Sequence, residues 1–146
     1  MTGRLIGIAR AAQLRAPLEE LSVVQISVES GIEGDARGVK PRRQVTVLFR
    51  EGWEAACREI ASQLPWTTRR ANLYVEGFKF PREPGWRLRV GGVVLEVTQE
   101  TAPCELMERA HAGLRSAMTP DWRGGVCCSV VRGGEIRIGS MVERVG

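Results

Sequence analysis

The sequence predicts a mainly β fold, either a barrel or a sandwich, with two or so α-helices at its periphery. Many short runs are rich in β-branched residues, glycine-containing turns separate several of them, and only two segments have helical periodicity. Strands and helices do not alternate regularly, which argues against a doubly wound parallel sheet. The chain of 146 residues is long enough for one domain with a substantial core, so we expect a single domain over residues 1–146.

The short apolar runs are the expected strands. They cover residues 4–9, 21–28, 44–49, 71–75, 86–90, 93–98, 126–131, 135–138 and 141–145. Gly91-Gly92 separates two of these runs, and a two-residue glycine turn of this kind closes a β-hairpin. Arg132-Gly133-Gly134 separates another two in a similar way. We therefore expect two hairpins.

Two segments carry apolar residues at three- and four-residue steps, the spacing of one helix face. The first covers residues 51–63, and Cys57 lies on its apolar face, so this cysteine is expected to fill the core. The second covers residues 103–117. It begins with Pro103, whose missing N–H costs nothing in the first helical turn.

Cys104 is the residue that most strongly suggests chemistry. It lies in residues 99–105 (QETAPCE), where an expected strand gives way to the second helix. The first turn of a helix offers unpaired N–H groups and the positive end of the helix dipole, which favour a thiolate. A thiolate is the form of cysteine that acts as a nucleophile or a metal ligand. Position alone leaves open that Cys104 is a small core residue.

The other cysteines do not suggest a metal site. Residues 57, 104, 127 and 128 give neither a CxxC motif nor a Cys/His spacing suited to zinc. Cys127 and Cys128 are adjacent on an expected strand and point to opposite faces, so we expect two core residues. A disulfide or a sulfur relay between one of them and Cys104 stays open. The single histidine, His111, is expected at the surface of the second helix.

Composition bears on location and partners. No apolar run approaches the roughly 18–20 residues that span a bilayer, and the N-terminus does not resemble a signal peptide. We therefore expect a cytoplasmic protein with reduced thiols and no membrane contact. Of the 21 basic residues only Lys40 and Lys79 are lysine. The arginines are mixed with acidic residues along the chain, which favours a small anionic ligand over a nucleic acid.

A series of short motifs runs along almost the whole chain. They are G-x-x-G-D at residues 31–35, R-x-V at 43–45, R-x-N-L-x-V-x-G at 70–77, G-x-x-L-x-x-G at 85–91, P-C at 103–104, R-G-G at 123–125 and G-x-I-x-x-G at 134–139. In this order and spacing the set resembles the MOSC domain, the family named after the C-terminal part of molybdenum cofactor sulfurases. The resemblance covers roughly residues 3–145 and implies a MOSC-like β-barrel.

The resemblance implies a function for particular residues. Cys104 would be the catalytic cysteine, which carries sulfur in some members and ligates the molybdenum of a pterin cofactor (molybdopterin) in others. Arg70 and Asn72 would hold anionic or polar parts of the pterin, and Arg43 and Arg123 its phosphate. Gly124 would permit close approach of the backbone to the cofactor.

Three functions are compatible with these residues. The first is reduction of N-hydroxylated compounds by a molybdenum-dependent oxidoreductase that receives electrons from a separate donor protein. The second is a sulfurtransferase-like carrier, which holds a persulfide on Cys104 and delivers it to molybdenum cofactor or metal-sulfur cluster assembly. The third is a module that only binds an anionic ligand. Pyridoxal phosphate, a cofactor associated with the wider family, is expected on a partner cysteine desulfurase, because neither Lys40 nor Lys79 is a convincing Schiff-base lysine.

Overall fold

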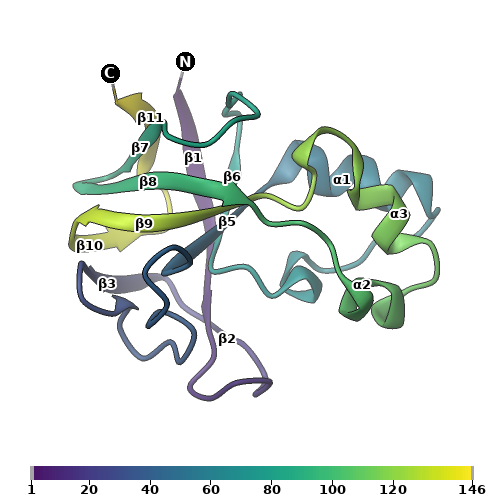
Figure 1. Cartoon of the computed structure of the whole chain (residues 1–146), viewed down its shortest axis with the longest axis horizontal. Coiled ribbons are helices and arrows are strands. Elements are labelled where there is room, and N and C mark those ends of the chain that lie inside the picture. The colour runs from purple at the N-terminus through teal and green to yellow at the C-terminus, as the bar shows by residue number, and fades with distance from the viewer. Residues whose placement is uncertain (1, 146) are drawn as a thin grey trace.

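Seven strands close into a barrel in the computed structural model, which describes residues 2–145 (Figure 1). They are β1 (Thr2–Arg10), β5 (Val45–Phe49), β6 (Leu73–Glu76), β7 (Arg87–Val90), β8 (Val93–Glu100), β9 (Val126–Arg132) and β11 (Met141–Val145). The order around the barrel is β11-β7-β8-β9-β5-β6-β1, and pairing of β1 with β11 closes it. Only the β5–β6 pair of this barrel is parallel. The mainly β fold class is therefore confirmed, as a barrel rather than a sandwich.

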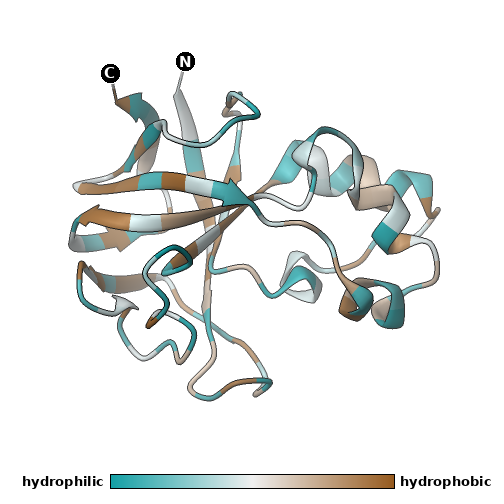
Figure 2. Cartoon of the chain, in the orientation of Figure 1, coloured by the Kyte–Doolittle hydropathy of each residue, from teal (hydrophilic) through white to brown (hydrophobic). Residues whose placement is uncertain are grey.

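Four further strands extend this framework. β2 (Glu19–Glu20) pairs with the end of β1, while β10 (Gly134–Arg137), β3 (Val23–Ser27) and β4 (Gly31–Ile32) form a small second sheet. Figure 2 shows hydrophobic and hydrophilic residues alternating along the barrel strands. Ile26 and Ile136 from the second sheet join the same apolar cluster as the inward residues of the barrel, so one core holds both sheets together.

The helices gather beside the barrel (Figure 1). They are α1 (Arg50–Glu59), α2 (Glu105–Ala110) and α3 (Leu114–Met118), with short 3-10 helices η1 (Trp66–Arg69) and η2 (Pro120–Trp122). β5 connects the two parts because it is buried on both faces. Val45, Val47 and Phe49 belong to the barrel core, whereas Leu48 belongs to a second cluster formed with the helices.

Both expected helices are shorter than predicted. α1 ends at Glu59 because Ala61 adopts a left-handed conformation (φ 51°), which reverses the chain. The second predicted helix is split into α2 and α3 by an extended His111 and a left-handed Gly113 (φ 86°). The Glu108 carboxylate accepts a hydrogen bond from the Gly113 N–H at 2.9 Å and so satisfies a donor that the break exposes.

One of the two predicted hairpins is confirmed and the other is wrong. β7 and β8 pair across Gly91-Gly92, with Val90 opposite Val93. β10, in contrast, pairs with β3 and not with β9. The reason is that both edges of β9 are occupied already, one by β5 and the other by β8. Among residues 2–145, no helix is long and apolar enough to cross a membrane.

Candidate functional site

Cys104 lies at the surface between β8 and α2. Its backbone is extended (φ −128°, ψ −175°), and the residue forms the N-cap of α2. Cys57, Cys127 and Cys128 are buried, as their expected core positions require, whereas Cys104 is exposed. α2 has only six residues, so the macrodipole of this helix is a weak source of thiolate stabilisation. Charged side chains close to the cysteine therefore matter more.

One such side chain is that of Arg69, the last residue of η1, which Cys104 influences electrostatically. It is only 8% exposed, yet none of the ion pairs formed within residues 2–145 involves it. Its Nη2 donates to the carbonyl oxygens of Thr101 at 2.8 Å and Ala102 at 3.4 Å, and its Nε donates to that of Gly124 at 3.2 Å. The buried guanidinium thus fixes the loop that leads into Cys104.

Burial and nearby charged groups act on the pKa of the Arg69 guanidinium. Burial lowers the pKa of the Arg69 guanidinium, and the positive charge of Arg43 lowers it further. Negative charge on Cys104, Cys127 or Glu100 acts in the opposite direction. Arginine nevertheless stays protonated at neutral pH. Arg43 and Cys104 therefore share the electrostatic environment of one buried cation.

Cys127 lies beneath the same loop. Its Sγ is 3.3 Å from Oγ1 of Thr101, and both side chains are buried. Cys128, the next residue of β9, faces the barrel core, and burial raises the pKa of its thiol. Cys128 is thus held in the thiol form inside the barrel, while Cys127 approaches the polar loop before Cys104.

Asn72 is buried between strands of the barrel. It is 2% exposed, and its Oδ1 accepts a hydrogen bond from the Thr46 N–H at 3.0 Å. Its Nδ2 donates to the Ala9 carbonyl oxygen at 3.2 Å. The carboxamide thereby connects β5 to β1, and both of its polar atoms have partners within the protein.

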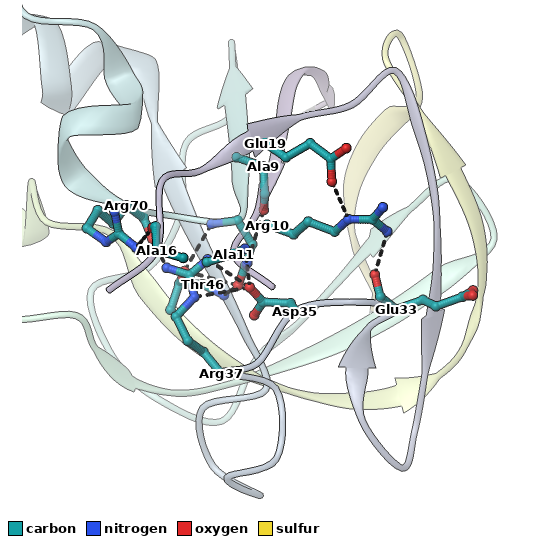
Figure 3. A network of polar contacts seen from close by, with 11 residues as sticks. Ala9, Arg10, Ala11, Ala16, Glu19, Glu33, Asp35, Arg37, Thr46 and Arg70 are labelled. Carbon is teal, nitrogen blue, oxygen red and sulfur yellow. Dashed lines mark hydrogen bonds and ion pairs between the residues drawn. The ribbon is translucent and has the colours of Figure 1, made fainter. Parts of the chain in front are cut away.

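Arg70 is directed to a different polar network, which Figure 3 shows together with Arg37 and Asp35. Arg70 adopts a left-handed conformation (φ 63°), and its Nη2 donates to the Ala16 carbonyl oxygen at 2.6 Å. Its own carbonyl oxygen accepts a hydrogen bond from Nη1 of Arg37. Burial lowers the pKa of Arg70, the charge of Arg37 adds to this effect, and Asp35 opposes it. Arg69 and Arg70, although adjacent, therefore serve different parts of the molecule.

Asp35 anchors this second network. Its side chain is fully buried, pairs with Arg37 at 3.0 Å and accepts a hydrogen bond from the Ala11 N–H at 2.9 Å. Close by, Arg10 donates to the Glu33 carbonyl oxygen and to the Glu19 carboxylate (Figure 3). These contacts join the loop after β1 to the loop after β4.

The last two predicted cofactor residues are Arg123 and Gly124. Arg123 forms an ion pair with Glu59 and donates through Nη1 to the Ala117 carbonyl oxygen at 2.9 Å. At Gly124, a Cβ atom would lie 2.2 Å from the Thr101 carbonyl oxygen. Gly124 thus permits the close contact of two loops, both of which accept hydrogen bonds from Arg69.

Arg43 and Cys104 therefore both act electrostatically on Arg69, an arginine that the sequence motifs did not select. The only signal for Arg69 was its place in the Arg69-Arg70 pair, because its burial depends on the tertiary contacts of η1. Residues 2–145 contain no group of three or more His, Cys, Asp or Glu side chains able to hold a metal ion.

The closed barrel and the exposed cysteine just beyond one of its strands place this chain among small β-barrel domains that carry a surface cysteine. The chain belongs to the MOSC domain family, whose sequence model matches residues 34–143. No curated protein sequence matches this chain closely enough to count as a relative.

Solved structures agree with this assignment. The YuaD protein from Bacillus subtilis superposes with a TM-score of 0.82 at 19% identity, over 97% of this chain and 94% of that one. YiiM from Escherichia coli gives a TM-score of 0.73 at 20% identity, over 98% of this chain and 70% of that chain. YiiM from Geobacillus stearothermophilus gives 0.71 at 14% identity, over 99% and 73%. At these identities the likeness extends to the fold alone.

Proposed function

We propose that this MOSC protein acts through the thiolate of Cys104, which binds the molybdenum of a pterin cofactor, and that it reduces N-hydroxylated compounds. Electrons would come from a separate donor protein. The observation that carries the proposal is the contrast between one exposed cysteine and three buried ones, with a buried guanidinium fixing the loop beside the exposed thiol.

Cys104 suits a soft metal because thiolate is a soft ligand. The cofactor, when bound, supplies a redox-active metal together with the remaining ligands. Arg69 contributes a permanent positive charge in a buried position close to the loop that carries Cys104. Its hydrogen bonds to Thr101 and Ala102 hold the loop in place and reduce the entropy lost when a ligand binds.

Arg43 is the best candidate for a phosphate contact. Its side chain is exposed and lies close enough to Arg69 to affect the pKa of that residue. A guanidinium binds phosphate in bidentate fashion. Arg70, Asn72 and Arg123 would have to give up the protein contacts described above before they could contact a cofactor. We therefore assign cofactor contact first to Cys104 and Arg43.

A second candidate function is a persulfide carrier, and the exposure of Cys104 favours it. The cavity described below is lined by other residues, and a carrier requires only that a partner reaches the thiol. In the loading step the Cys104 thiolate attacks the outer sulfur of a donor persulfide. A sulfur–sulfur bond forms on Cys104, the donor's sulfur–sulfur bond breaks, and the donor cysteine leaves as thiolate. Either function requires a reducing compartment, so we place the protein in the cytoplasm.

Metal analysis of protein purified from cells that make the cofactor tests the proposal. We expect one molybdenum per chain in the wild type and none in Cys104→Ala, while Cys57→Ala, a buried control, keeps its metal once its folding is verified. Intact mass spectrometry of the same samples tests the second function, which predicts one added sulfur atom on Cys104 without metal. Equal molybdenum in wild type and Cys104→Ala would contradict the leading proposal.

A further inference from the structure

A cavity of about 830 Å³ opens between the loop after β6, the start of α1 and η2. Its volume lies within the usual range for small-molecule sites. Apolar surface dominates the lining, which includes Phe49, Phe78, Phe80 and Trp122. Cys104, Arg43 and Arg69 do not line it, although Arg123 does, so the cavity does not include the reactive cysteine of the site proposed above.

The aromatic wall of this cavity is an ordered stack. The rings of Phe49 and Phe80 have centroids 4.2 Å apart and planes 23° apart. Phe78 lies 6.1 Å from Phe49 with planes 19° apart. Trp86 stacks on Phe78 at 5.8 Å and on Phe80 at 6.1 Å, with planes 22° apart in both pairs. Nearly parallel rings of this kind offer a flat face on which a further planar ring can stack. Offset stacking is a preferred arrangement of aromatic pairs.

Two charged residues at the cavity, Glu51 and Lys79, form no ion pair within residues 2–145. Arg82 pairs with Asp121 at 3.1 Å, and Arg123 pairs with Glu59. Glu51 accepts a hydrogen bond from the Gly77 N–H at 3.0 Å. Lys79, between two of the stacked phenylalanines in sequence, takes part in none of the ion pairs formed within residues 2–145. Its ammonium group is available to a ligand anion.

The backbone is strained at Asp121 and Trp122, which also line the cavity. Asp121 (φ 58°) and Trp122 (φ 53°) are consecutive non-glycine residues in the left-handed region. A bulky aromatic residue rarely adopts this conformation, and such strain is concentrated at ligand-binding segments. Here the turn brings Trp122 and the Asp121–Arg82 pair to the cavity.

We propose that this cavity binds a small planar aromatic anion, with the ring stacked on the Phe80 side of the aromatic wall and the anionic group on Lys79. The stacked rings specify a flat ligand over an aliphatic chain. The unpaired ammonium specifies an anion over a neutral or cationic molecule.

Isothermal titration calorimetry with 2-naphthoate tests this proposal. We expect one ligand per chain, and binding weakened roughly fivefold in Lys79→Gln because an exposed ion pair contributes up to about 1 kcal/mol. Lys40→Gln is the matched control, since it removes the only other lysine and lies outside the cavity lining. It should bind as the wild type does, and so should Cys104→Ala. Phe80→Ala, if folded by circular dichroism, should lose about tenfold in affinity.

Two comparison ligands separate the other possible occupants. 2-Naphthylmethanol keeps the ring and removes the charge, while octanoate keeps the charge and replaces the ring with a chain. Both should bind at least fivefold more weakly than 2-naphthoate. The proposal is overturned by an absence of 2-naphthoate binding at millimolar concentration, by equal affinity in Lys79→Gln and Lys40→Gln, or by equal affinity for either comparison ligand.

Discussion

Arg69 carries a positive charge at a position where residues 2–145 provide only carbonyl oxygens as direct partners. Burying a charge without an opposite charge is unfavourable, and hydrogen bonds to carbonyl groups offset only part of the lost hydration. A site with this property gains stability when an anion occupies it. The thiolate of Cys104, or an anion bound beside it, meets that requirement.

Replacing Arg69 should affect both stability and the reactivity of Cys104. Arg69→Met leaves three carbonyl groups without their donor, so we expect a loss of about 2–3 kcal/mol in the free energy of unfolding in urea. The rate of Cys104 alkylation by iodoacetamide in the folded protein should change severalfold, because the loop that leads into Cys104 loses the hydrogen bonds that hold it. Arg69→Lys should reverse part of that change.

Arg43→Gln is the control for the unfolding measurement. Arg43 is exposed, so its replacement should change the free energy of unfolding by no more than about 0.5 kcal/mol. Unchanged alkylation in Arg69→Met, measured on protein that is still folded, would show that the hydrogen bonds of Arg69 do not position Cys104.

The loop between β8 and α2 and the loop between η2 and β9 form one unit. They meet where Gly124 lies against Thr101, and the Thr101 N–H donates to the Gly125 carbonyl oxygen at 2.9 Å. Arg69, from η1, donates to both loops. The position of Cys104 therefore depends on three segments that are far apart in the sequence.

Gly124→Ala should separate these loops. The new Cβ would lie 2.2 Å from the Thr101 carbonyl oxygen, a backbone atom that cannot move freely. We expect a loss of about 1–3 kcal/mol in the free energy of unfolding, together with a changed alkylation rate for Cys104. Gly92→Ala is the matched control, because a Cβ at Gly92 meets nothing within 4 Å and the φ angle there is not positive. A Gly124→Ala protein as stable as Gly92→Ala would contradict this account of the loop contact.

The barrel could be predicted from sequence because its strands are encoded locally, in alternating or continuously apolar runs such as β5 and β8. The partner of β10 could not, because it depends on which strand edges remain free after the barrel closes. Cys104 could be selected from its place between a strand and a helix. Arg69 could not be chosen over Arg70, because only the left-handed turn at Arg70 directs the two side chains to different networks.

A tyrosine at the contact between the helices and the barrel makes the free energy of unfolding of the whole molecule depend on pH in the alkaline range. Tyr74 of β6, the only tyrosine, stacks on Trp66 with ring centroids 5.1 Å apart, and burial raises the pKa of its hydroxyl from 10.0 to about 12. Because the folded protein holds this proton more tightly than the unfolded chain, the stabilisation is complete below pH 10. It is lost as pH rises to about 12.

Tyr74→Phe keeps the stacked ring and removes the titrating group. Between pH 10 and 12 the free energy of unfolding should fall by about 1–2 kcal/mol more in the wild type than in Tyr74→Phe, after allowance for solvent screening. Denaturation in urea at a series of pH values measures both curves. Burial also raises the pKa of Cys128, so some decrease remains in the variant. Parallel curves for the two proteins would mean that the Tyr74 hydroxyl ionises as readily in the folded protein as in the unfolded chain.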